Sequence, residues 1–241
     1  MKHPLLVFGI VHLGLVILLI CLSIIVWEVS WEWVLIAFLL YCVFFVIVVV
    51  RLLRHYYHFP IPSVMTRFID NPLRRKFWQN PDVIAERMHL EPGMLVVEIG
   101  PGKGSYTKAV AKRILPDGKV FAVDISEKVI TLLKKRVEDE GISNIIPKID
   151  DAYHLSFANE SVDRVLAVSC LPEIPDPIKV LTECHRILKP NGLICLSELV
   201  IDPDYPWRKT EKRWAAEAGL ELVQEFGRWT AYQLHFQKKC H

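Results

Sequence analysis

The chain has 241 residues and a formal net charge of +2, which allows one or two domains and excludes the strongly basic composition of many nucleic-acid-binding proteins. Its apolar fraction of 52% is high for a soluble protein. Six cysteines occur without a CxxC pair, and no group of potential metal ligands stands out. We therefore expect reduced, mostly buried thiols and no metal site.

Two apolar runs at the N-terminus account for the excess hydrophobicity. Residues 4–26 and 33–50 contain no acidic side chain, lysine or arginine, and a transmembrane helix needs about 20 apolar residues. A signal peptide is disfavoured because the first run exceeds the usual apolar region and no small-x-small cleavage site follows. A domain of under 200 residues cannot bury both runs, so the sequence predicts a transmembrane helical hairpin over residues 1–54.

The charges beside these runs predict an orientation. Residues 27–33, between the runs, carry two acids, no base and three tryptophans, whereas arginines begin directly after the second run at Arg51 and Arg54. The positive-inside rule then places the N-terminus and everything after residue 54 in the cytoplasm. We expect an integral membrane protein in contact with the lipid bilayer, and a homo-oligomer is possible because transmembrane hairpins often pair.

Residues 55–90 interleave basic and aromatic side chains with several prolines. Aromatic rings can lie at headgroup depth while arginines contact lipid phosphates. We therefore predict an amphipathic segment along the membrane surface, with a plain solvated linker as the alternative.

Residues 91–241 form a third region, in which short apolar runs alternate with amphipathic helical patterns. This alternation predicts a doubly wound, mainly parallel, Rossmann-like α/β sheet of seven strands. The last two strands are joined by the short turn 227–230, so the last strand should be antiparallel. The expected strands are 94–99, 119–124, 145–149, 162–168, 193–199, 221–226 and 231–237, and the expected helices are 105–114, 127–140, 178–188 and 207–218.

The first of these strands runs into the sequence VVEIGPGKG, residues 96–104. Its glycines let the backbone turn sharply and let a ligand approach closely. A dinucleotide loop requires G-x-G-x-x-G, but position 105 is serine. Glu98 would repel a diphosphate, yet it suits a ligand that carries an ammonium and a sulfonium group. The loop therefore favours S-adenosylmethionine (SAM) over NAD.

Further motifs follow in a familiar order: VFAVD at 120–124, DDA at 150–152, VDRVLAVS at 162–169 and LKPNGL at 188–193. Together with the glycine loop they resemble class I SAM-dependent methyltransferases, particularly the ubiquinone/menaquinone methyltransferase-like group. The resemblance covers about residues 80–237, and it implies that Asp124 accepts from the ribose hydroxyls and that Asp151 contacts the adenine amino group. The implied cofactor-binding residues are Glu98, Gly100, Gly102, Gly104, Asp124, Ile125, Asp151, Ala152 and Ser169.

The methyl acceptor is less constrained by the sequence. No convincing general base is visible; Glu173 and Tyr205 are outside candidates for substrate contact, whereas His154 and Asp150 fit surface roles better. Quinone-type relatives carry a sizeable substrate-covering insertion after the fifth strand, and here that link is only about residues 200–206. We therefore expect a lipid-like acceptor covered by segment 55–80 and the bilayer. A non-catalytic SAM-binding domain, a soluble small-molecule methyltransferase that is merely anchored, and a nucleotide-dependent oxidoreductase remain alternatives.

Overall fold

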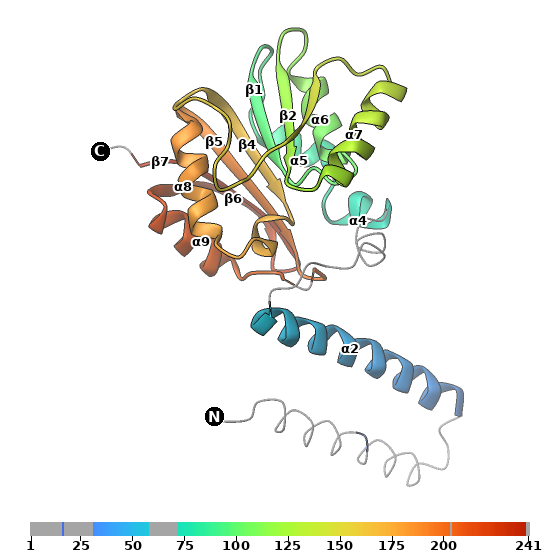
Figure 1. Ribbon diagram of the computed structural model, residues 1–241. Coiled ribbons are helices and arrows are strands. Elements are labelled where there is room, and N and C mark those ends of the chain that lie inside the picture. Colours follow the sequence, from blue (N-terminus) through green and yellow to red (C-terminus); the bar gives the residue numbers. More distant parts are fainter. Residues whose placement is uncertain (1–15, 17–30, 58–71, 203, 240–241) are drawn as a thin grey trace. The chain divides into compact units, whose positions relative to one another are not determined.

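The computed structural model describes residue 16 and residues 31–57, 72–202 and 204–239 (Figure 1). The chain divides into two compact units, Met1–Leu53 and Arg54–His241, and each is considered separately.

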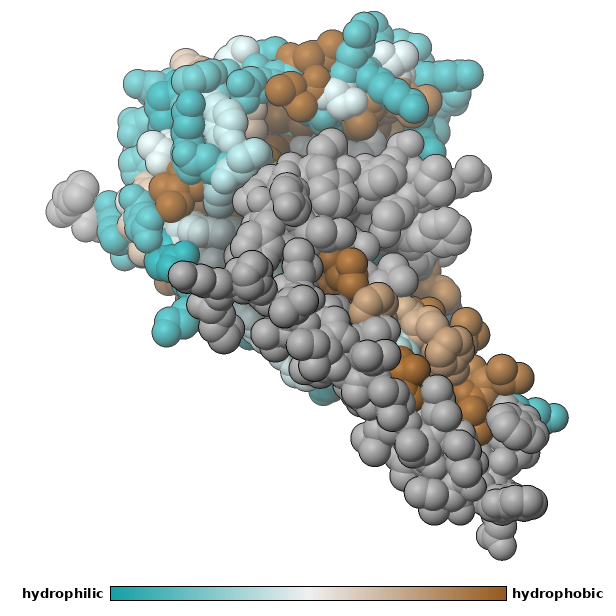
Figure 2. Space-filling view, turned by 60° about the horizontal axis from the view of Figure 1, so that its bottom comes forward, coloured by the Kyte–Doolittle hydropathy of each residue, from teal (hydrophilic) through white to brown (hydrophobic). Residues whose placement is uncertain are grey.

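Most of helix α2, Trp31–Tyr57, lies in the first unit, and this helix includes the second apolar run. Large apolar side chains are exposed along α2, and Figure 2 shows hydrophobic residues on its surface. Nowhere in the described ranges does a helix combine the length and the apolar character needed to cross a membrane. Apart from Val16, the first run of the predicted hairpin lies outside the described residues. The exposed side chains of α2 include Trp33, Leu35, Phe38, Leu39, Leu40 and Phe44.

The second unit is built on a seven-stranded sheet in the order β3-β2-β1-β4-β5-β7-β6. Neighbouring strands pair in parallel except at β7, which is antiparallel to both β5 and β6. The order reverses between β1 and β4, which is the switch point where ligands of such sheets bind. The strands are β1 Leu95–Ile99, β2 Lys119–Asp124, β3 Ile145–Ile149, β4 Val162–Val168, β5 Leu188–Leu199, β6 Leu220–Arg228 and β7 Ala231–Lys238.

Helices cover both faces of this sheet because alternate strand residues point to opposite sides. On one face Val97 and Leu196 pack with α8, Pro177–Ile187, and α9, Arg208–Glu217. The other face, which includes Val96 and Leu166, packs with three helices. These are α5 Pro81–Arg87, α6 Ser105–Arg113 and α7 Glu127–Asp139 (Figure 1).

The predicted Rossmann-like architecture with an antiparallel last strand is confirmed, and strands β2, β3 and β4 have the predicted bounds. Three short helices were not predicted: α4 Pro72–Phe77, α5, and the 3-10 helix η1 Leu171–Glu173. Each has fewer than eight residues, too short to show helical periodicity. Helix α5 begins with a visible signal, since Asn80 caps the amides of Asp82 and Val83 and is followed by a proline.

Candidate active site

The loop after β1 lies at the switch point and faces the segment that follows β4. Its first turn is held by a hydrogen bond from the Gly100 amide to the Val123 carbonyl, 2.9 Å. A Cβ built on Gly100 would lie 2.2 Å from Sγ of Cys170, so only glycine fits beside that side chain. The loop and the residues after β4 therefore pack directly against each other.

Gly100, Gly102 and Gly104 all have positive φ, +68°, +51° and +78°, a conformation that glycine adopts readily. Gly104 caps α6, and a Cβ there would meet Leu133 at 2.5 Å. At Gly102 a Cβ would meet nothing within 4 Å. Gly100 and Gly104 thus hold the loop against the domain, while Gly102 faces open space in which a ligand can approach the backbone.

Glu98 lies one residue before the end of β1 and is 1% exposed. Within the described part of the chain its Oε2 atom is buried without a hydrogen-bond partner. Burial raises the pKa of Glu98 to about 7. A buried, unsatisfied carboxylate oxygen is costly, and a cationic ligand group would satisfy it.

Asp124 ends β2, as predicted. Its Oδ1 accepts a hydrogen bond from the Ser126 amide at 2.8 Å, and partial burial raises its pKa. The next residue, Ile125, is 75% exposed. The pair offers a carboxylate beside an apolar surface at the edge of the loop, which suits a nucleoside with hydroxyls on one side and a flat base on the other.

The two aspartates after β3 have different environments. Asp150 accepts hydrogen bonds from the Ser156 amide and hydroxyl and pairs with Lys148 at 3.2 Å. Asp151 is exposed and accepts one bond, from the Tyr153 amide. The carboxylate of Asp150 is therefore occupied in holding its own loop, whereas Asp151, beside the half-buried Ala152, keeps an oxygen that a ligand could use.

Ser169 follows β4 and adopts a positive φ of 48°. Its amide donates to the Ser197 carbonyl on β5, and its hydroxyl accepts from Nη2 of Arg74 at 2.6 Å. Gln79 lies between the two serines, with Nε2 at 3.5 Å from Ser169 Oγ and 3.1 Å from Ser197 Oγ. The side chain of Ser169 is thus held by the segment that precedes the sheet.

Arg74 is the centre of this network and was not singled out from the sequence. It forms a bidentate ion pair with Asp202, 2.9 Å to each oxygen, and donates from Nε to Gln79. The Arg74 and Asp202 side chains are only 6% and 10% exposed. The expectation that the arginines of 55–80 contact lipid phosphates is therefore wrong for Arg74, because a buried carboxylate takes its guanidinium.

A second buried polar group lies on the opposite face of β5. Glu198 and Glu211 are 1% and 0% exposed, and Oε1 of Glu198 and both oxygens of Glu211 have no hydrogen-bond partner among the described atoms. Burial raises the pKa of Glu211 to about 8. Burial and the neighbouring Glu211 raise the pKa of Glu198 far above its usual range. Nothing in the sequence pattern indicated that Glu198 on β5 and Glu211 on α9 would be buried.

The remaining residues that the sequence suggested for the site are His154, Glu173 and Tyr205. His154 is exposed, and its amide closes a bridge to Asp151. Glu173 is exposed at the end of η1, next to the loop after β4. Tyr205 donates from its hydroxyl to the Trp229 carbonyl at 2.6 Å, which ties the β5–α9 link to the β6–β7 turn.

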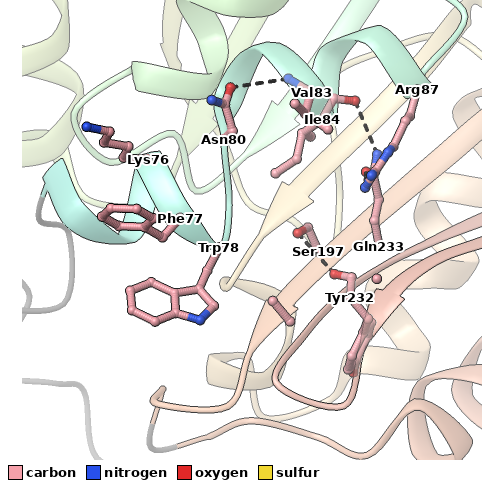
Figure 3. Close-up of a pocket in the computed structure, with 12 residues that line it drawn as sticks. Lys76, Phe77, Trp78, Asn80, Val83, Ile84, Arg87, Ser197, Tyr232 and Gln233 are labelled. Carbon is pink, nitrogen blue, oxygen red and sulfur yellow. Dashed lines mark hydrogen bonds between the residues drawn. The ribbon is translucent and has the colours of Figure 1, made fainter.

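A pocket of about 300 Å³ lies beneath α4 and α5, against β5 and β7 (Figure 3). Trp78 and Ile84 stand on its helical side, and Ser197 and Tyr232 on its strand side. Since Gln79 contacts both Ser197 and Ser169, the pocket is separated from the carboxyl end of β4 by one side-chain network.

The fold and the glycine loop define a class of protein, and the comparisons agree. Residues 97–196 match the family model described as a methyltransferase domain. A SAM-dependent methyltransferase from Aquifex aeolicus has the same fold, with a TM-score of 0.67 at 18% identity, over 73% of this chain and 98% of that one. A Haemonchus contortus phosphoethanolamine N-methyltransferase in complex with S-adenosylhomocysteine gives a TM-score of 0.55 at 17% identity, over 67% and 52%.

More particular relatives are quinone methyltransferases. The chain is 32% identical over 124 residues to a demethylmenaquinone methyltransferase of Geobacillus stearothermophilus, covering 51% of this chain and 53% of that protein. It is 32% identical over 127 residues to the ubiquinone/menaquinone biosynthesis C-methyltransferase UbiE of Bordetella avium, covering 50% and 49%. The chain thus spans about half the length of these relatives. Its domain is homologous to SAM-dependent methyltransferases such as UbiE.

The residues present fit SAM as a cofactor. Glu98 supplies a buried anionic oxygen for a cationic group, Gly102 leaves the backbone open, and Asp124 stands where ribose hydroxyls would bind. The contacts of the individual site residues with SAM remain predictions.

Proposed function

We propose that the protein is a membrane-anchored SAM-dependent methyltransferase that transfers a methyl group to a lipid or other membrane-associated acceptor. In this proposal residues 1–54 hold the protein in the bilayer, and the N-terminus and the catalytic domain lie in the cytoplasm. The observation that carries it is the combination of a methyltransferase domain with long apolar runs, the second of which exposes large side chains along α2.

Exposed aromatic side chains of the catalytic domain support the same proposal. Phe77 and Trp78 at the end of α4 are 63% and 52% exposed, and Trp207 and Trp229 are both 68% exposed. Tyr205 connects the last two, since its ring contacts Trp207 and its hydroxyl bonds to the Trp229 carbonyl. Tryptophan is favoured at membrane–water interfaces because one end of its ring system is apolar and the other can stay wet.

The chemistry required of the protein is modest. SAM supplies an activated methyl group, so the chain's own residues mainly orient the reactants and exclude water. The loop 100–104 would orient the cofactor. Arg74 of α4 bonds to Ser169 and Asp202, which follow β4 and β5. The relatives named as quinone methyltransferases make an isoprenoid ring compound a reasonable acceptor, alongside a polar lipid headgroup.

The direct test is to incubate the full chain with methyl-labelled SAM and a total membrane lipid extract, followed by chromatography of the products. We expect label in a lipid fraction for the wild type and none for Gly102→Ala. A matching truncation that removes residues 1–54 should bind SAM normally but lose turnover on lipid acceptors. Full activity of that truncation on a water-soluble acceptor, with no labelled lipid in either protein, would refute the proposal.

A further inference from the structure

The pocket beneath α4 and α5 has the chemistry of a specific ligand site. We propose that it binds an amphiphile carrying an anionic group, such as a phosphate or carboxylate attached to an apolar chain or ring. Its role as the methyl acceptor rests on the proposed function, whereas binding itself does not.

One part of the pocket lining is apolar. Phe77 and Trp78 stand at the α4 end, and Val83 and Ile84 project from α5 (Figure 3). Ala231 of β7 also lines the pocket. Its volume of about 300 Å³ is at the lower end of the roughly 300–1,000 Å³ typical of small-molecule sites. The pocket can therefore hold one ring system or a short acyl segment, but not a whole lipid.

The charge in the pocket has one sign. Lys76 and Arg87 line it, toward opposite ends in Figure 3, and no acidic residue is among its described lining residues. Neither cation forms an ion pair within the described part of the chain: Lys76 lies 5.5 Å from the Phe77 ring, and Arg87 donates to Gln233 at 3.3 Å. Two cations beside a group of apolar side chains favour a ligand with an anionic group.

The two acids of α5, Asp82 and Glu86, do not line the pocket. Asp82 is paired with Arg113 of α6 at 3.0 Å.

The polar groups on the strand side of the pocket, which form its floor, already have hydrogen-bond partners. The Ser197 hydroxyl accepts a hydrogen bond from Gln79 and donates one to the Tyr232 carbonyl. Arg87 also lies over the Phe226 ring at 4.7 Å. Since the floor groups already have partners, the two cations, which lack an acidic partner in the described part of the chain, are the groups that select the ligand.

The location explains how such a ligand would serve the reaction. The Gln79 amide that bonds to Ser197 in the floor also reaches Ser169 at the end of β4. The exposed rings of Phe77 and Trp78 flank the opening on the α4 side. An amphiphile leaving a membrane would thus meet an aromatic entrance, two cations and, behind Gln79, the segment that follows β4.

The test is photo-labelling of the full chain with a diazirine-bearing dodecyl phosphate, followed by peptide mapping. We expect label in residues 76–87 and 227–233, competed by dodecyl phosphate and not by dodecyltrimethylammonium. Competition by inorganic phosphate alone would show that the site selects free phosphate, and would overturn the amphiphile proposal. Label spread over other peptides would also overturn it.

Matched variants test whether the labelling depends on the pocket. Val83, 37% exposed, lines the pocket, so Val83→Trp should fill it and reduce labelling at least tenfold. Val223→Trp, at a 41% exposed position of β6 outside the pocket, is the control and should label normally. Lys76→Glu should weaken labelling about tenfold, whereas Lys119→Glu, at the start of β2, should not. Unchanged labelling of Val83→Trp would refute the pocket.

The labelling and methylation assays test the pocket and the proposed function separately. Pocket labelling with normal SAM binding but no methylated lipid would leave the binding site standing and refute the transferase proposal. Methylated lipid produced equally by the wild type and Val83→Trp would refute the pocket as the acceptor site while leaving the transferase proposal intact.

Discussion

The buried ion pair between Arg74 and Asp202 gives the most quantitative prediction. Arg74→Ala removes two charge-assisted bonds to Asp202, one to Ser169 and one to Gln79, and leaves the Asp202 carboxylate buried without its partner. Breaking a buried pair on one side typically costs about 3–5 kcal/mol. The cost cannot exceed the free energy that docks α4, because the segment can detach and let Asp202 rehydrate. We therefore expect a loss of about 3 kcal/mol.

The measurement is a double-mutant cycle. Urea unfolding of the full chain in mild detergent gives the free energy of unfolding for Arg74→Ala, Asp202→Ala and the double variant, and hydrogen exchange of residues 72–79 reports whether α4 detaches. Lys76→Ala, on the exposed side of α4, is the control and should change stability by less than about 0.5 kcal/mol. Simple additivity of the two single variants, or full protection of 72–79 in Arg74→Ala, would refute the reasoning.

Three further predictions concern the loop and the buried acids. Because Glu98 has a pKa of about 7 and a cationic ligand prefers its ionised form, the affinity for SAM, measured by titration calorimetry, should rise between pH 6 and pH 8. Glu98→Gln should bind SAM at least about tenfold more weakly at pH 8, and its affinity should not depend on pH in this range. An equal pH dependence in the variant would contradict this reasoning. Gly102→Ala should cost about 1–2 kcal/mol of stability from its positive φ alone, whereas Gly100→Ala also collides with Cys170 and should cost clearly more in thermal unfolding. Glu211 has a pKa of about 8 in the folded state against 4.5 in the unfolded state, so the folded state binds more protons between those values. Stability therefore falls as the pH rises through that window. Glu211→Gln should flatten the dependence of stability on pH and should melt at a higher temperature than the wild type at pH 8.

The sheet and its cofactor loop could be read from the sequence because both depend on local patterns. Apolar runs bounded by turn residues gave the strands, and the glycines of 100–104 occur where the backbone adopts positive φ. Asp124 was placed correctly because the end of a strand is fixed by the strand itself. Such features need no knowledge of which distant segments meet.

The cover of the site could not be read in the same way. Arg74 and Asp202 are 128 residues apart, and Arg74 belongs to a basic run that looks like a solvated or lipid-facing surface. Its ion pair with Asp202 in the β5–α9 link is a long-range pairing that leaves no periodic signal. Glu198 and Glu211 were missed for a related reason, since buried acids are rare and their strand and helix patterns are otherwise ordinary.

The same ion pair changes how the short β5–α9 link should be interpreted. This link, about residues 200–206, is too short to contain the insertion that would cover an acceptor. The sequence alone therefore predicts that the bilayer contributes to the cover. Asp202, within this link, pairs with Arg74 of α4, the helix whose Lys76 and Phe77 line the pocket. Docking of α4 therefore supports one wall of the pocket. Undocking of α4 by Arg74→Ala should consequently weaken dodecyl phosphate labelling of the pocket while leaving SAM bound at Glu98 and the glycine loop.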